Sequence, residues 1–367
     1  MTTNSNKPLI FSFFSGAGFL DLGFEHSGFE IAYVNEVHAP FLDAYKYSRA
    51  RMHIPPPIYD YYEGDVSDLL IGRSDLLTEY VGAAKDSGRL VGFIGGPPCP
   101  DFSVGGKNKG KDGENGKLSK TYVQIICEQK PDFFVFENVK GLYRTAKHRA
   151  FFDILKNELL NAGYVCTERL INSIEYGVPQ DRERIILFGT RMKGLRRGVD
   201  YFDWSIGVKY PDRSAFNFKW PKWGQSEWTP EQYPDIPKEL MVQHWFDVND
   251  VTNHANASHH FQPRAGLTKF QTIAEGDDSK KSYKRLHRWR YSPTAAYGNN
   301  EVHIHPIFPR RISAAEALAI QSLPKEFELP ANMTLSNMFK TVGNGVPYLA
   351  AKGIALAINK FFYGDYE

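Results

Sequence analysis

The sequence of 367 residues contains little cysteine and no long apolar run. Its three cysteines, Cys99, Cys127 and Cys166, show neither disulfide-framework nor metal-ligand spacing, which argues against disulfides and zinc and for a reducing cytoplasm. No apolar stretch approaches the length of a membrane span, and the N-terminus lacks a signal-peptide pattern. We therefore expect a cytoplasmic protein with no metal and no membrane partner.

Net charge is also nearly absent, because 44 Lys and Arg stand against 42 Asp and Glu. A nucleic-acid surface would therefore have to be a local patch. Residues 280–290, K-K-S-Y-K-R-L-H-R-W-R, form one basic cluster. Residues 105–117 contain five glycines, four lysines and no apolar side chain, which predicts a solvated loop.

The first half of the chain alternates strand-like and helix-like segments. Residues 9–14 predict a buried strand, followed by a glycine turn at 15–18 and an amphipathic helix. This alternation favours an α/β fold with a mostly parallel sheet and helices on both faces. The further strands are expected at 31–34, up to 64–66, at 90–94, 133–136 and 185–189, and the further helices around 41–45 and at 118–129 and 151–162.

The composition changes after residue 192. All six tryptophans lie between there and residue 291, and the α/β alternation is lost. We predict three regions: a catalytic and cofactor-binding domain at 1–194, a smaller domain with a compact aromatic core at 195–300, and a segment at 301–367 that returns to the first domain. Helical patterns at 313–323 and 348–362 support that return.

Residues 95–103, G-G-P-P-C-P-D-F-S, place Cys99 directly after the strand at 90–94. Two glycines and two prolines stop a strand and leave the next side chain at the rim of the sheet, where ligands of open α/β sheets bind. Cys99 is therefore a candidate nucleophile, with a packed cysteine in a tight turn as the alternative. Cys127 and Cys166 lie in helix-like and strand-like runs and are expected to be packing residues.

Three successive strand ends carry groups suited to a nucleotide-like cofactor. The turn F-S-G-A-G at 14–18 allows close backbone approach at a helix N-terminus. Glu36 can accept two hydrogen bonds from a ribose diol, and Asp65 can accept one from an adenine amino group. Each carboxylate alone could equally be a solvated loop charge, but their order along the chain is specific.

Together these motifs resemble the DNA (cytosine-5-)-methyltransferases of bacterial restriction–modification systems, over nearly the whole chain. The matching motifs are F-S-G-A-G at 14–18, Glu36, Asp65, P-P-C-P-D-F-S at 97–103, E-N-V at 137–139, Q-D-R-E-R at 180–184, R-I-S-A-A-E-A-L-A-I-Q-S-L-P at 311–324 and G-N-G-V-P at 343–347.

Four positions depart from the family pattern. Ser12 stands where the family often has Asp, Phe19 where a third Gly is common, Pro100 where Gln is usual, and Gly345 where Ser or Ala is usual. None of these changes removes a catalytic group, but those near the first motif affect the detailed cofactor contacts.

The resemblance implies a Rossmann-like S-adenosylmethionine-dependent methyltransferase sheet with a smaller target-recognition domain. It implies methyl transfer to carbon 5 of a flipped cytosine in duplex DNA, with S-adenosylhomocysteine as product. Cys99 would be the nucleophile, and Glu137 would share a proton with ring nitrogen 3. Arg182 would steady the base or the intermediate, and Arg184 would hold Glu137 or the backbone in place. The implied cofactor-binding residues are Phe14, Gly16, Ala17, Gly18, Glu36, Val37, Asp65, Val66, Pro98, Leu118, Asn344 and Gly345.

The resemblance also implies partners. Residues 105–117 would close over the DNA, and 195–300 would read its sequence, with Arg285, Arg288 and Arg290 as the first residues to test, although packing or solvation is as good an explanation for any one of them. We expect a monomer in the bacterial nucleoid that protects host DNA beside a restriction endonuclease acting on the same site.

Two other functions fit the same motifs. A member of the superfamily could methylate cytosine in transfer RNA, but the large segment at 195–300 favours a DNA sequence reader. A catalytically dead paralogue could only bind DNA, but the retention of Cys99, Glu137 and Arg182 argues against it. A methyl-transfer assay on DNA, on transfer RNA and without substrate separates the three.

Overall fold

A seven-stranded sheet forms the centre of the larger lobe, in the order β3-β2-β1-β4-β5-β7-β6. The computed structural model describes residues 6–98, 114–191, 202–225, 227–263, 266–280, 282–294, 297 and 302–364. All neighbouring pairs are parallel except those made by β7, which runs antiparallel to both β5 and β6, so the predicted mostly parallel sheet is confirmed. The strands are β1 (Leu9–Phe13), β2 (Glu30–Glu36), β3 (Tyr61–Glu63), β4 (Val91–Gly95), β5 (Phe133–Val139), β6 (Val165–Asn172) and β7 (Glu183–Thr190).

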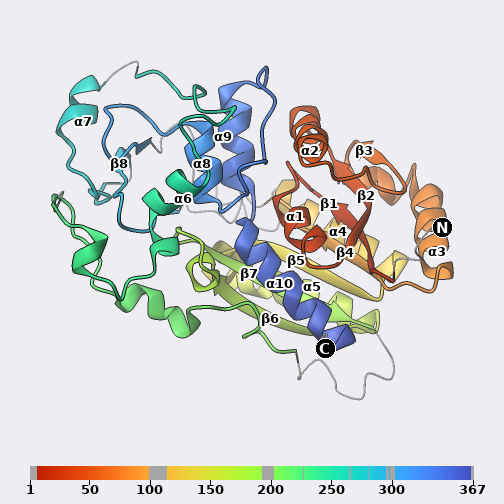
Figure 1. The fold of residues 1–367 in the computed structure, drawn as a ribbon. Coiled ribbons are helices and arrows are strands. Elements are labelled where there is room, and N and C mark those ends of the chain that lie inside the picture. Colours follow the sequence, from red (N-terminus) through yellow and green to blue (C-terminus); the bar gives the residue numbers. More distant parts are fainter. Residues whose placement is uncertain are drawn as a thin grey trace.

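Helices cover both faces of this sheet because its strands alternate apolar side chains to either side. Phe11 and Phe93 face one side with α3 (Ser74–Asp86), α4 (Glu114–Gln129) and α5 (Ala146–Asn161). Ile10 and Ile94 face the other with α1 (Phe19–Glu25), α2 (Ala39–Arg51) and α10 (Tyr348–Tyr363), and Figure 1 shows α10 crossing this face. The C-terminal helix thus returns to the sheet as predicted.

The path of the chain reverses at β1, which pairs with β2 on one side and β4 on the other. In open α/β sheets the crevice beyond the carboxyl ends of such strands is the usual ligand site. The glycine turn follows β1, and Pro97 and Pro98 follow β4, so the topology brings these two segments to one edge of the sheet.

A smaller lobe lies beside the sheet lobe and contains short elements. It comprises α6 (Val242–Val248), α7 (Leu267–Thr272), β8 (Lys284–Arg285), β9 (His303–Ile304), α8 (Ala314–Ile320) and α9 (Leu335–Asn344) (Figure 1). Buried residues of α6, α8 and α9 pack with those of α1 and α2 in one continuous cluster. The C-terminal segment therefore joins the two lobes before α10 reaches the sheet.

The expected compact tryptophan core in the second region forms only in part. Trp220, Trp228 and Trp289 share one small cluster, whereas Trp223 is 65% exposed. Trp204 packs on the sheet lobe instead, with its Nε1 donating to Thr167 Oγ1 at 3.1 Å, and the neighbouring Phe202 ring lies 4.4 Å from that of Phe188. The start of the segment assigned to 195–300 is therefore packed as part of the sheet lobe.

Two further expectations need correction. α4 begins at Glu114, so residues 114–117 are helical and not part of a loop, and α9 was not predicted.

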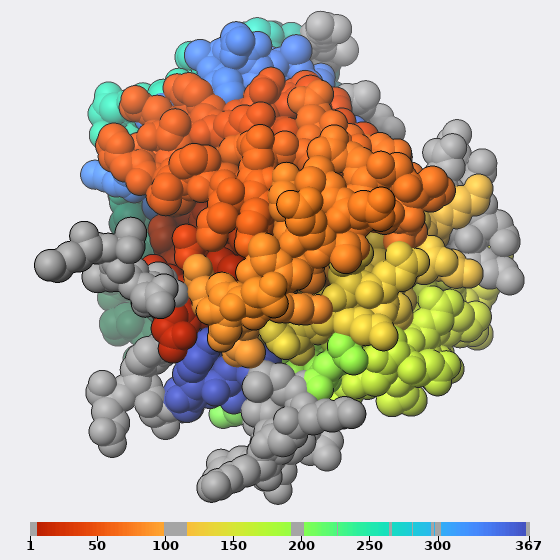
Figure 2. Space-filling view, turned by 90° about the vertical axis from the view of Figure 1, so that its right-hand side faces the viewer, coloured from red at the N-terminus to blue at the C-terminus, as the bar shows by residue number. Residues whose placement is uncertain are grey.

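Figure 2 shows the end of the sheet lobe, which is formed mostly by residues of the first half of the chain. Within the described ranges, no helix has the length and apolarity needed to cross a membrane, and no group of three metal-ligating side chains occurs.

Candidate active site

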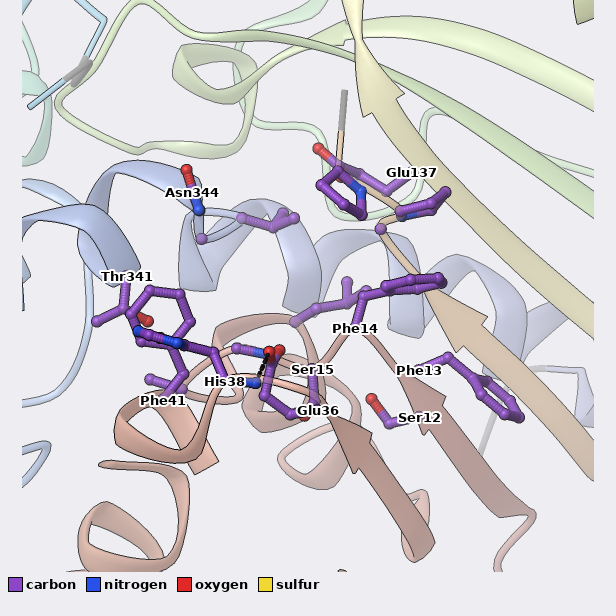
Figure 3. Close-up of a pocket in the computed structure, with 18 of the residues that line it drawn as sticks. Ser12, Phe13, Phe14, Ser15, Glu36, His38, Phe41, Glu137, Thr341 and Asn344 are labelled. Carbon is purple, nitrogen blue, oxygen red and sulfur yellow. Dashed lines mark hydrogen bonds between the residues drawn. The ribbon is translucent and has the colours of Figure 1, made fainter. Parts of the chain in front are cut away.

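A cavity of about 700 Å³ lies beyond the carboxyl ends of β1, β2, β4 and β5, with the end of α9 as its opposite wall. Figure 3 shows Phe14, Glu36, Thr341, Asn344 and Glu137 around it. Eleven of the twelve predicted cofactor residues line this cavity: Phe14, Gly16, Ala17, Glu36, Val37, Asp65, Val66, Pro98, Leu118, Asn344 and Gly345.

Left-handed backbone shapes the turn after β1. Phe14 has a φ of 54°, a conformation that is uncommon for any residue other than glycine, and Gly16 has a φ of 58°. The Phe14 ring lines the cavity and lies edge-on to Tyr122, with ring centroids 6.0 Å apart. The turn therefore exposes both backbone and an aromatic surface to the cavity.

Gly18, the twelfth predicted residue, is absent from the cavity lining and instead lies on the packed side of the turn. A Cβ at this position would come within 2.4 Å of the Tyr45 ring, and its φ is 79°. The Arg49 guanidinium donates to the Gly18 carbonyl oxygen at 2.7 Å. Gly18 therefore supports the turn from behind.

Backbone amides hold the strand-end carboxylate of Glu36 in place. Gly16 N donates to Oε2 at 2.8 Å and His38 N donates to Oε1 at 2.9 Å. Asp65 is exposed and caps the following 3-10 turn, with Ser67 N donating to its Oδ1 at 2.8 Å. Each carboxylate oxygen can accept two hydrogen bonds, so both residues keep capacity for ligand donors.

Glu137 and Arg184 form an ion pair in the cavity wall. Arg184 Nε lies 2.8 Å from Glu137 Oε1, and the Glu137 side chain is only 9% exposed. Burial raises the pKa of Glu137 above its ordinary value, and the opposing charges of Arg184 and then Arg182 limit the rise. The carboxyl group thus keeps its proton to a higher pH than an exposed glutamate.

Arg182 has different contacts from Arg184. It is buried and is absent from the cavity lining, and its guanidinium donates to the carbonyl oxygens of Gly343 at 2.8 Å and Gly345 at 3.0 Å. These bonds tie the start of β7 to the G-N-G-V-P motif. For Arg184 the structure provides a contact for both expected roles, since its Nε lies 2.8 Å from Glu137 Oε1 and its Nη1 donates to the Glu183 carbonyl oxygen at 2.8 Å.

Cys99 lies outside the described residues, as do residues 100–113. The two residues before it, Pro97 and Pro98, line the cavity, and Asn138 Nδ2 donates to the Pro97 carbonyl oxygen at 3.3 Å. The other two cysteines are partly buried packing residues, as predicted, and burial raises the pKa of the Cys127 and Cys166 thiols to about 11 and about 12.

Two of the departures from the family pattern meet in space. A Cβ on Gly345 would lie 2.2 Å from the Phe19 ring. Phe19, at a position where glycine is common, thus occupies the space that a side chain at 345 would need. The glycine at 345 is therefore the steric complement of the phenylalanine at 19.

The cavity residues that sequence reasoning missed include His38, Phe41, Lys340 and Thr341. The His38 and Phe41 rings lie 4.4 Å apart at the start of α2, and Lys340 Nζ lies 5.8 Å from the Phe41 ring centroid. Lys340 and Thr341 belong to α9. An amphipathic pattern just before G-N-G-V-P was the signal that could have identified this helix.

The basic cluster at 280–290 is largely engaged within the protein. Arg285 is 4% exposed and donates to the carbonyl oxygens of Ile273 and His305, each at 2.7 Å. Arg288 pairs with Glu275 through Nε at 2.9 Å and a terminal nitrogen at 3.0 Å. Arg290 is partly exposed above the Tyr291 ring. The expectation that Arg285 is available to DNA is therefore wrong.

Comparison with known proteins identifies relatives along the whole chain. The family described as C-5 cytosine-specific DNA methylase matches residues 9–360. The Type II methyltransferase M.NmeDI of Neisseria meningitidis serogroup C is 67% identical over 362 residues, which cover 98% of this chain and 86% of the relative. M.XorII of Xanthomonas oryzae pv. oryzae is 31% identical over 96% of this chain and 85% of its own length.

Solved structures share the fold at low sequence identity. A structure assigned to a DNA modification methyltransferase encoded within an E. coli prophage has a TM-score of 0.68 at 21% identity and covers 97% of this chain and 99% of its own. The S. pombe Dnmt2 methyltransferase has a TM-score of 0.62 at 12% identity, covering 97% of this chain and 100% of its own. These likenesses show a common methyltransferase fold.

Proposed function

The chain belongs to the C-5 cytosine-specific DNA methylase family, and on that premise we propose that it methylates a cytosine flipped out of a specific duplex DNA sequence, through a covalent adduct with Cys99. The observation that carries this proposal is one cavity shared by the Glu137–Arg184 pair, the two prolines before Cys99 and the strand-end carboxylate Glu36. Both halves of a methyl-transfer site thus meet at one sheet edge.

S-Adenosylmethionine is the proposed cofactor, and the cavity fits it. Glu36 is fixed with acceptor capacity for a ribose diol, and Asp65 can accept from an adenine amino group. Val37 is 61% exposed and lines the cavity near Phe41, which supplies apolar surface for a purine ring. When bound, this cofactor supplies an electrophilic methyl group on a sulfonium.

Carbon 5 of cytosine is a poor nucleophile, and we propose that Cys99, Glu137 and Arg184 activate it. Addition of the Cys99 thiolate to carbon 6 makes an enamine whose carbon 5 is nucleophilic. Negative charge then develops at ring nitrogen 3, where the protonated Glu137 carboxyl can donate. Arg184 orients that carboxyl, and loss of the carbon 5 proton after methylation expels Cys99.

The target base has to leave the duplex, because carbon 5 and carbon 6 are inaccessible to this chemistry inside the stack. Residues 105–113, rich in glycine and lysine, are the proposed segment that closes over the DNA. Residues from about 209 to 300, which include α6, α7 and β8, are the proposed sequence reader, and Arg290 is the first of them to test. Protection of host DNA beside a cognate endonuclease is the proposed role.

A methyl-transfer assay tests this proposal directly. Tritiated S-adenosylmethionine is incubated with the protein and duplex DNA, with transfer RNA, or with neither. Incorporation into DNA alone supports the proposal, incorporation into transfer RNA alone supports the rival enzyme, and binding of DNA without incorporation supports a dead paralogue. Sequencing of methylated cytosines in DNA from expressing cells then identifies the target sequence.

Exchange of the proposed sequence reader tests whether sequence recognition and catalysis belong to different parts of the chain. Replacement of residues 209–300 by the counterpart from a relative of different specificity should change the methylated sequence while activity persists. A folded and active chimera that keeps the original target would place the reader elsewhere, with residues 105–113 as the next candidate.

A further inference from the structure

A buried polar cluster lies beneath the glycine turn, between β1, α1 and α2. Its members are Ser12, Asp21, Glu25, Tyr45 and Arg49, of which Ser12, Asp21, Tyr45 and Arg49 are almost fully buried. Only Ser12 and Asp21 of this cluster line the cavity. The cluster therefore adjoins the proposed cofactor site through these two residues, which are 1% and 0% exposed.

The hydrogen bonds of Asp21 come from neutral groups. Ser12 Oγ donates to Oδ1 at 2.9 Å, and Tyr45 OH donates to Oδ2 at 3.0 Å. Burial raises the pKa of Asp21, and Arg49, Ser12 and Tyr45 oppose that rise. The two hydroxyls thus fix the direction of the Asp21 carboxyl group.

The one guanidinium of the cluster is directed to other partners. Arg49 Nε lies 2.8 Å from Glu25 Oε2, and Arg49 also donates to the Gly18 carbonyl oxygen at 2.7 Å. With Glu25 paired in this way, the cluster has two carboxylates for one guanidinium. Among the residues that the structure describes, Asp21 has no direct ion pair, and it is the carboxylate of this cluster at the cavity wall.

We propose that Asp21 recognises the positive charge of the amino-acid portion of the cofactor, a role that rests on the proposed use of S-adenosylmethionine. This portion carries a sulfonium and an ammonium, and a buried carboxylate interacts strongly with a cation that enters the same water-poor cavity. Ser12 and Tyr45 position the carboxylate. Arg49 positions the turn through Gly18.

The position of Asp21 also accounts for Ser12, where the family often has Asp. Their side-chain oxygens are 2.9 Å apart, so a carboxylate on residue 12 would reach nearly the same place. The negative charge that β1 lacks at residue 12 is in this chain supplied by α1.

Calorimetry with three ligands tests the assignment. S-Adenosylmethionine carries both positive groups, S-adenosylhomocysteine carries only the ammonium, and 5′-methylthioadenosine carries neither but keeps the nucleoside that Glu36 and Asp65 would hold. Asp21→Asn should weaken the binding of S-adenosylmethionine about tenfold and the binding of 5′-methylthioadenosine by less than about twofold, since only S-adenosylmethionine loses a charge-assisted contact. S-Adenosylhomocysteine then identifies the group that Asp21 contacts. If its binding weakens as much as that of S-adenosylmethionine, the contact is with the ammonium; if its binding is unchanged, the contact is with the sulfonium.

Matched variants separate charge from structure. Tyr45→Phe removes one of the two hydrogen bonds that position the carboxylate but keeps the carboxylate itself, and should lower the affinity ratio of S-adenosylmethionine to 5′-methylthioadenosine less than Asp21→Asn does. Asp21→Ser is a second neutral variant, in case the amide is not accommodated, and should lower that ratio. Ser12→Asp combined with Asp21→Ser should restore the ratio, because the carboxylate returns from the strand.

The outcomes distinguish this inference from the proposed function. The role of Asp21 would be overturned if Asp21→Asn weakened the binding of all three ligands equally or of none. It would also be overturned if the double variant Ser12→Asp with Asp21→Ser bound 5′-methylthioadenosine but did not restore the affinity ratio. A wild-type protein that fails to bind S-adenosylmethionine at all would instead overturn the proposed cofactor.

Discussion

The two lobes use their charged side chains in opposite ways. In the sheet lobe, Glu36 and Glu137 line the cavity, each held by a few contacts at a strand end. In the small lobe, the arginine at the centre of the basic cluster, Arg285, is buried among backbone carbonyl oxygens. Glu36 and Glu137 are therefore at a ligand cavity of the sheet lobe, whereas Arg285 is inside the small lobe.

The difference follows from how the hydrogen-bonding groups of the backbone find partners in each lobe. Seven paired strands and long helices satisfy the polar backbone groups of the sheet lobe, so its strand-end side chains can serve a ligand. The small lobe has strands of only two residues, and side chains such as Arg285 have to donate to its loop carbonyls. A charge in a segment poor in regular structure should first be examined as a structural donor.

The largest expected effect tests the chemistry of the sheet lobe. Cys99→Ser should abolish methyl transfer, because an alcohol at neutral pH is a far poorer nucleophile than a thiolate. DNA binding should survive, and duplex DNA with 5-fluorocytosine at the target should trap a covalent complex with the wild type alone. Methylation by Cys99→Ser near the wild-type rate would falsify the mechanism.

Glu137→Gln should lower the turnover number by about 100- to 10,000-fold, the range typical of lost acid–base catalysis. The wild-type rate should also decline as pH rises through the raised pKa of Glu137, because the acid form is needed and is lost above that pH. Rate profiles from pH 5 to 9 check this, and the variant should lack this limb. An unchanged limb in Glu137→Gln would assign it to another group.

The comparison between the lobes predicts that arginines of the basic cluster differ in kind. Arg285→Ala should lower the free energy of unfolding by about 3 kcal/mol, because buried carbonyl oxygens lose their donor. Arg290→Ala should change stability by less than about 0.5 kcal/mol. Urea titrations measure both, and the structural role of Arg285 is excluded if the two variants are equally stable.

Loss of a strand-end carboxylate should have a moderate effect on cofactor binding. Glu36→Ala and Asp65→Ala should each make the binding of S-adenosylmethionine less favourable by about 1–3 kcal/mol, the usual cost of removing a hydrogen bond to a charged group. Calorimetry measures the affinities, with Asp43→Ala on the exposed side of α2 as the control. Unchanged affinity in both variants would remove these residues from the site.

The smallest expected effect concerns the complementary pair at the cavity wall. Gly345→Ala should destabilise the protein by about 1–3 kcal/mol, because the new methyl group overlaps the Phe19 ring. In a Phe19→Ala background the same change should cost about 1 kcal/mol less. Thermal unfolding of the four proteins gives this coupling, and strictly additive effects would show that the two departures are independent.

Much of the sheet lobe could be predicted because its signals are local. Strands such as β1 and β4 are apolar runs that end at glycine or proline, and the carboxyl ends of neighbouring parallel strands necessarily share an edge. Eleven of the twelve cofactor residues that the resemblance implied line one cavity, and those at the strand ends do so for this reason. Gly18 is absent from that lining, since only tertiary packing puts Tyr45 and Arg49 behind it.

The sequence by itself determined the order of the motifs, the alternation of the sheet lobe and the chemistry available at each strand end. Only the tertiary structure decided which charges face the cavity. Asp21 reaches the cavity from a helix, Arg182 is turned to the carbonyls of Gly343 and Gly345, and Arg285 is buried in the small lobe. The physical reason is that a buried charge must find partners, and those partners come from segments far apart in the sequence.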